Sequence, residues 1–61
     1  MKELIIMLAE TGDRAMVETA KQFLREYGID WNEHWWALKK IYGSNEEDEK
    51  DIVIHIVKYF L

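Results

Sequence analysis

Gly12, Gly28 and Gly43 divide a proline-free chain of 61 residues into segments of helix length. Two of these glycines follow a tyrosine, in Tyr27-Gly28 and Tyr42-Gly43. Glycine is common just past the last turn of a helix, because it adopts a positive φ without the penalty of a Cβ atom. The glycine spacing therefore predicts a series of helices joined by short loops.

The segment between the first two glycines has the periodicity of an amphipathic helix. Its apolar residues recur at steps of three and four, and polar residues fill the opposite face. Asp13 or Thr11 can cap its start by accepting hydrogen bonds from the free backbone N–H groups of the first turn. The predicted apolar face consists of Met16, Val17, Ala20, Phe23, Leu24 and Tyr27.

The segment after Gly28 predicts another helix, for which Asp30 is a suitable N-cap. At about 100° of rotation per residue, Trp36 points away from the inward stripe of this helix. The loop from the preceding helix is only two or three residues long, so we expect the two helices to pack on each other. The inward stripe is Trp31, Trp35, Leu38 and Tyr42, flanked by His34 and Ile41.

The last segment starts with a predicted capping box, formed by Ser44 and Glu47. The acidic run 46–51 then lies on the first turns of a helix, where the helix dipole favours carboxylates. Residues 52–61 are rich in β-branched side chains and could form a strand on propensity alone. A polar stripe at helical steps favours a helix instead; it consists of Asp48, Asp51, His55 and Lys58.

Apolar side chains cover more than half of the circumference of this last helix. We expect one row to face inward, namely Ile52, Ile56 and Phe60. A second row lies on the far edge and needs its own cover: Ile54, Val57 and Leu61. The first segment, Leu4–Ala9, consists only of apolar residues, and this pattern is compatible with either a helix or a buried strand. It can fold back over the second row; otherwise a second copy or a partner must cover that row.

These segments predict an all-α fold, a small bundle of three long helices plus a short apolar N-terminal helix (or strand). A chain of this length is expected to form a single helical domain over residues 1–61. The chain contains no cysteine, so no disulfide or thiolate metal site can compensate for a small core.

The charge distribution argues against nucleic acid as a partner. Residues 46–51 contain five acids and one base, which accounts for the whole net charge of −4. The remaining chain has no cluster of Lys and Arg of the kind that binds phosphates. No charge-free run approaches the roughly 20 residues of a membrane helix, and no signal peptide is visible. We therefore expect a cytoplasmic protein that does not bind membranes.

The two histidines are the obvious candidates for catalysis. His34 follows Glu33, and His55 lies one helical turn after Asp51. A His–Asp pair needs a nucleophile within reach, and we expect the one serine, Ser44, to be a cap. Two histidines on different helices match no zinc spacing, and there is no Gly-rich phosphate loop. We expect a protein that is not an enzyme and that has no catalytic residue, metal or cofactor.

Aromatic and apolar side chains give the stronger functional prediction. Trp36 points outward beside Lys40, with which it can form a cation–π contact. Leaving such a side chain in water forgoes roughly 4 kcal/mol of burial energy, and tryptophan is enriched at interface centres. We therefore expect a small protein-interaction module that binds a protein partner, or itself as a homodimer. The predicted partner-binding residues are Trp36, Lys40, Ile54, Val57 and Leu61.

An alternative function uses the acidic run. Residues 46–51 could imitate a nucleic-acid backbone, which would make the chain a small acidic inhibitor that blocks a nucleic-acid-binding enzyme by charge mimicry. The same residues also suit a solvated helix start.

A further alternative comes from a loop motif. Tyr27-Gly28-Ile29, then seven residues, then Ala37-Leu38 resembles the ubiquitin-associated domain, where a Met-Gly-Phe/Tyr loop ends the first helix and an Ala-Leu pair follows at that spacing. Here tyrosine replaces the loop's usual methionine, and an acidic insertion precedes the last helix. In that family the loop and the end of the last helix hold ubiquitin. The resemblance thus implies ubiquitin binding by Tyr27, Gly28, Ile29, Tyr59 and Phe60.

Overall fold

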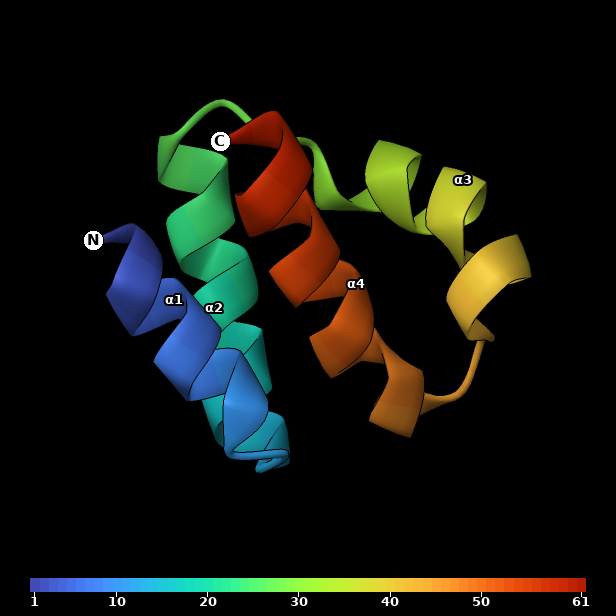
Figure 1. The fold of residues 1–61 in the computed structure, drawn as a ribbon, viewed down its shortest axis with the longest axis horizontal. Helices are drawn as coiled ribbons and strands as arrows, with labels where there is room; N and C mark the ends of the chain where they lie inside the picture. Colours follow the sequence, from blue (N-terminus) through green and yellow to red (C-terminus); the bar gives the residue numbers. More distant parts are fainter.

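The computed structural model describes every residue of the chain except the side chain of Glu46. The described backbone forms four α-helices and contains no strand. The helices are α1 (Lys2–Glu10), α2 (Arg14–Glu26), α3 (Trp31–Tyr42) and α4 (Glu46–Phe60) (Figure 1). The all-α prediction is confirmed, and the strand alternative for the first segment is wrong.

Helix α1 is longer than the sequence suggested. It spans nine residues, because Lys2, Glu3 and Glu10 extend the helix at both ends of the apolar run. Ile5 and Ala9, four residues apart, are its buried residues, as expected for one face of a helix. The prediction of a short N-terminal element was therefore wrong in length.

Two of the predicted caps form as expected. The Asp13 carboxylate accepts hydrogen bonds from the backbone N–H groups of Ala15 and Met16, and the Asp30 carboxylate accepts one from the backbone of Asn32. Each bond satisfies a donor that the first turn of a helix leaves free.

Helix α2 ends in a Schellman motif at Gly28. The Gly28 N–H donates to the Arg25 carbonyl, and the Ile29 N–H donates to the Leu24 carbonyl. Gly28 has φ of +82°, as this motif requires. The motif turns the chain directly into α3.

The predicted capping box at the start of α4 does not form. Asn45 is the N-cap, and its side chain makes no capping hydrogen bond. Ser44 therefore lies one residue outside the helix, too early for its hydroxyl to cap the first turn. The Asp48 N–H donates instead to the main-chain oxygen of Asn45.

Helix α4 lies between the α1–α2 pair and α3 (Figure 1). It contacts all three other helices, whereas α3 contacts α2 only slightly. The expected packing of α2 on α3 is therefore present but minor, because α3 packs mainly on α4. The core consists of Ile5, Ala9, Val17, Ala20, Leu24, Leu38, Ile52, Val53, Ile56 and Val57.

The second apolar row of α4 is covered within the chain. Val57 is 4% exposed, and Ile54 and Leu61 are partly buried against the core. The cover comes from α1, which makes its most extensive contacts with α4. Of the two covers that the sequence allowed, the structure shows the first segment against α4, and Val57 is not exposed to a partner in the folded chain. Partner binding by Ile54 and Leu61 stays a prediction.

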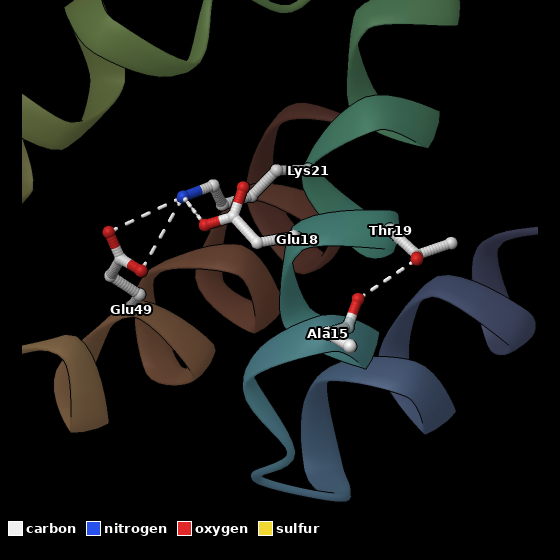
Figure 2. Close-up of polar contacts among 5 residues, drawn as sticks. All are labelled: Ala15, Glu18, Thr19, Lys21 and Glu49. Atoms are coloured by element: carbon white, nitrogen blue, oxygen red, sulfur yellow. Dashed lines mark hydrogen bonds and ion pairs between the residues drawn. The ribbon is translucent and has the colours of Figure 1, made fainter.

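One mostly buried lysine connects three helices. Lys21 Nζ on α2 lies 2.7 Å from Glu18 Oε1 and 3.4 Å from both carboxylate oxygens of Glu49 on α4 (Figure 2). It also lies 4.8 Å from the centroid of the Trp31 ring on α3. On the same helix the Thr19 hydroxyl donates to the Ala15 carbonyl (Figure 2). Lys21 thus fixes α2 against the start of α3 and the start of α4.

Candidate interaction surface

The most exposed large apolar side chains of α3 and α4 form the candidate site. Ile41 is 72% exposed, Trp36 61%, Tyr59 73% and Phe60 53%. We name these four residues the α3–α4 surface. The other exposed large apolar residues lie on or beside α1 and α2: Met1, Leu4, Met7, Met16 and Tyr27.

Trp36 points outward as predicted, but its cationic neighbour differs. Lys39 Nζ, not Lys40 Nζ, lies over the Trp36 ring, 3.5 Å from its centroid, and also lies 4.8 Å from the centroid of Trp35. The two tryptophan rings meet edge to face, with centroids 5.6 Å apart. Lys39 is three residues after Trp36 and four after Trp35, so its side chain can reach both rings. Lys40 is four residues after Trp36 but five after Trp35, so it can reach only the Trp36 ring. Lys40 is exposed.

The Trp35 indole carries an unsatisfied donor. Its Nε1 atom is buried and has no hydrogen-bond partner among the described residues. Most buried polar atoms of native proteins have a partner. This donor is therefore a local energetic cost, but its burial keeps it out of reach of a docking partner.

Phe60 was expected to face inward, and Ile41 was expected to flank the inward stripe of α3. Ile41 lies on the edge of the Leu38 stripe, beyond the reach of α4, and is therefore exposed. Phe60 is the last residue of α4, where the core ends. Its ring instead meets the ring of His34 edge to face, with centroids 4.6 Å apart.

A polar contact joins α3 to the outer side of α4. The Tyr42 hydroxyl and His55 Nδ1 are hydrogen-bonded at 2.7 Å. The His55 ring lies 4.7 Å from the ring of Tyr59 and 6.1 Å from that of Phe60, measured between centroids. The two histidines thus belong to one layer of rings between α3 and α4. No sequence motif singled out the Tyr42–His55 pair, because its members belong to different helices.

Carboxylates occupy the other end of the same side of α4. Asp48 and Asp51 precede His55 on the polar stripe. Asp48 lies beside the α3–α4 loop, since a Cβ atom built on Gly43 would be 2.5 Å from Asp48 Oδ2. Within the described residues, no group of three or more His, Cys, Asp or Glu side chains could hold a metal ion.

An open hollow of about 840 Å³ lies between α2 and the start of α3. Its lining mixes charges of both signs, with Lys21 already engaged by Glu18, Glu49 and Trp31. Gly28 and Ile29, two of the residues implicated by the ubiquitin-associated resemblance, also line it. In Figure 1 the α2–α3 turn and the C-terminal end of α4 lie at the same end of the view.

Among the described residues, no helix is long and apolar enough to cross a membrane. Searches against protein-family models, curated proteins and solved structures find no significant match to this chain.

Proposed function

We propose that this chain is a non-enzymatic protein-interaction module that binds a protein partner through the α3–α4 surface. The observation that carries the proposal is the exposure of Trp36, Ile41, Tyr59 and Phe60 beside a core that other residues already fill. The fold does not need these side chains in the interior. Large aromatic side chains that stay exposed are enriched at protein interfaces.

Trp36 is the expected anchor of this interface. Burying the exposed part of its side chain would contribute about 2–4 kcal/mol, at about 25 cal/mol/Å². Lys39 and Trp35 already contact its ring, so less side-chain freedom is lost on binding. Aromatic residues held in this way are frequent binding hot spots.

Trp36→Ala tests the proposal once a partner has been identified by pull-down and mass spectrometry. We expect the melting temperature to stay nearly unchanged, because Trp36 contributes little to the core, and partner binding to weaken by at least about 2 kcal/mol. Met7→Ala is the matched control, since Met7 is similarly exposed but lies on α1. Loss of the fold in Trp36→Ala, or equal weakening in both variants, would contradict the proposal.

The two alternatives remain hypotheses. Charge mimicry would need the acids of α4 to face a partner, and Glu49 is instead engaged by Lys21. Binding to a basic groove should weaken steeply as salt rises, whereas apolar docking should not. Direct titration with ubiquitin tests the ubiquitin-associated alternative, for which Tyr27 and Tyr59 are exposed.

A further inference from the structure

We infer that the outer face of α3 pairs with the same face of a second copy of this chain, with the two α3 helices antiparallel, in a weak dimer. We name the surface involved the α3 outer face: Asn32, Glu33, Trp36, Lys39 and Lys40. The inference goes beyond the proposed function and does not depend on it, because it needs only the geometry of α3.

The α3 outer face lies on the side of α3 that is turned away from α4. At about 100° of rotation per residue, all its members lie within about 60° of Trp36 around the helix axis. Leu38, the buried residue of α3, lies on the opposite side, where α3 packs on α4. In Figure 1 no other helix lies beyond α3 on the side away from α4. Trp36, at the centre of the face, is exposed, so the face is open to another molecule.

Glu33 and Lys40 bring opposite charges to this face without partners in the chain. Among the described residues, neither of them takes part in an ion pair. Both are exposed, and they lie about 10 Å apart along the helix axis. Lys39 differs from them, because its ammonium group lies over the Trp36 ring. The face thus carries one free carboxylate and one free ammonium group on either side of a tryptophan.

The order of these residues along α3 makes the face complementary to itself. Glu33 lies three residues before Trp36 and Lys40 four residues after it, which corresponds to about 4.5 and 6 Å along the axis. Both lie on the same flank of Trp36. A two-fold axis through Trp36, perpendicular to α3, therefore brings Glu33 of each copy level with Lys40 of the other. Reciprocal contacts of this kind are typical of two-fold symmetric dimers.

The centre and the other flank of the face match in the same arrangement. The two Trp36 rings meet at the two-fold axis, and each is already held by its own Lys39 and Trp35. Asn32 lies four residues before Trp36, so it comes level with Lys39 of the second copy, which lies three residues after. The amide oxygen of Asn32 can accept a hydrogen bond from that ammonium group. Each polar residue of the face thus gains a partner of matching chemistry.

The helix dipole explains part of this pattern but not the match. An acid in the first turn of a helix and cations in its last turn are stabilising on their own, and Glu33, Lys39 and Lys40 have these positions. The dipole acts on every side of the helix, however. It does not require that an acid and a cation lie on one flank, at nearly equal distances from an exposed tryptophan. This match favours a second copy as the occupant of the face.

We expect the pairing to be weak. The face offers one exposed tryptophan and a few charged side chains, which is less than the roughly 1,200 Å² of buried area typical of stable interfaces. The two-fold axis also brings Gly43 level with Asp30 of the second copy. Asp48 lies beside Gly43, so two carboxylates approach each other there, and each copy has a net charge of −4. The chain should therefore be a monomer at micromolar concentration and form dimers near about 1 mM.

Sedimentation equilibrium of the native chain between about 0.01 and 1 mM tests the pairing. We expect the average mass to rise from the 7.4 kDa of the monomer towards twice that value as the concentration increases. Trp36→Ala should raise the dissociation constant of the dimer at least about tenfold, because it removes the contact at the two-fold axis.

Two charge reversals identify the residues that pair. Glu33→Lys alone and Lys40→Glu alone each set like charges against each other and should raise the dissociation constant at least about tenfold. Glu10→Lys on α1 and Lys58→Glu on α4 make the same changes of net charge at other exposed positions. They should leave the dissociation constant within about threefold of the native value. Circular dichroism of each variant checks that the helix content is unchanged.

An equimolar mixture of the Glu33→Lys and Lys40→Glu variants provides the decisive measurement. Both contacts between residues 33 and 40 become attractive in a mixed dimer, so the mixture should be heavier than either variant alone. A mixture no heavier than its separate components would overturn the inference. A native dimer that survives both single reversals would do the same.

Two further outcomes would also overturn the inference. The first is a native chain that stays at 7.4 kDa at about 1 mM. The second is a dimer whose mass falls in Ile54→Glu but not in Glu33→Lys, which would assign the pairing to α4. The proposed function is decided separately, by the binding of Trp36→Ala to a captured partner.

Discussion

At the scale of single residues, the hydrogen bond between Tyr42 and His55 joins the side chains of α3 and α4. Tyr42→Phe removes the hydroxyl and leaves a partly buried ring nitrogen without its partner. We expect the free energy of unfolding to fall by about 1 kcal/mol, measured by urea denaturation. Tyr59→Phe is the matched control, because the Tyr59 side chain is highly exposed. Equal stability of the two variants would show that the bond contributes nothing.

The residue scale also shows where sequence reasoning reaches its limit. The outward direction of Trp36 followed from the helical period and is confirmed. The choice between Lys39 and Lys40 as its neighbour did not follow, because both lie within one turn and the tryptophan rotamer decides. The prediction that Phe60 faces the core was wrong for another reason. Phe60 lies on the same side of the helix as Ile52 and Ile56, but it is the last residue of α4 and lies beyond the end of the core. The helical period predicts which way a side chain points, but whether it is buried depends on whether another helix packs against it.

At the scale of elements, local signals predicted the helix ends well. The caps at Asp13 and Asp30 and the turn at Gly28 depend on contacts within a few residues, so the sequence contains what they need. The start of α4 was predicted wrongly, since Ser44 and Asn45 are both plausible caps and the path of the loop from α3 decides between them.

Gly43 provides an element-scale prediction. It ends α3 with φ of 105° and ψ of 171°, a region that is essentially restricted to glycine. Gly43→Ala should therefore lower the free energy of unfolding by about 1–3 kcal/mol and displace the Asp48 side chain. Gly12→Ala is the comparison, because Gly12 has φ of +71° and open space around its missing Cβ. Gly12→Ala should therefore lower the free energy of unfolding by less than Gly43→Ala does. Thermal denaturation measures both variants, and a lower melting temperature for Gly12→Ala than for Gly43→Ala would contradict this account of the Gly43 backbone.

Lys21 provides the second element-scale prediction. Lys21→Met keeps much of the apolar stem but removes the ammonium group that contacts Glu49 and the Trp31 ring. We expect a loss of about 1–2 kcal/mol in the free energy of unfolding, because Glu49 is left partly buried without its partner. Glu18→Gln removes only the exposed partner on α2 and should cost less than about 0.5 kcal/mol. A larger loss in Glu18→Gln than in Lys21→Met would contradict this account.

At the scale of the whole molecule, the sequence predicted the helical class but not the pairing of the helices. The short connection after Gly28 favoured packing of α2 on α3, yet α3 packs mainly on α4. Helix pairing depends on which apolar faces complement each other in three dimensions. For the same reason only part of the candidate surface could be predicted. The exposure of Trp36 follows from the periodicity of α3 alone, whereas the contact between His34 and Phe60 depends on how α3 and α4 pack.

The final prediction concerns the mass of the molecule in solution. Because Val57 is buried, and Ile54 and Leu61 are partly buried against the core, we expect this row not to pair with a second copy. Sedimentation equilibrium at micromolar concentration should therefore give a mass near 7.4 kDa. Ile54→Glu should leave that mass unchanged and lower the free energy of unfolding by about 2 kcal/mol, because it places a charge against the core. A doubled mass in the native chain that halves in Ile54→Glu would instead show that α1 leaves this row and that a second copy takes its place.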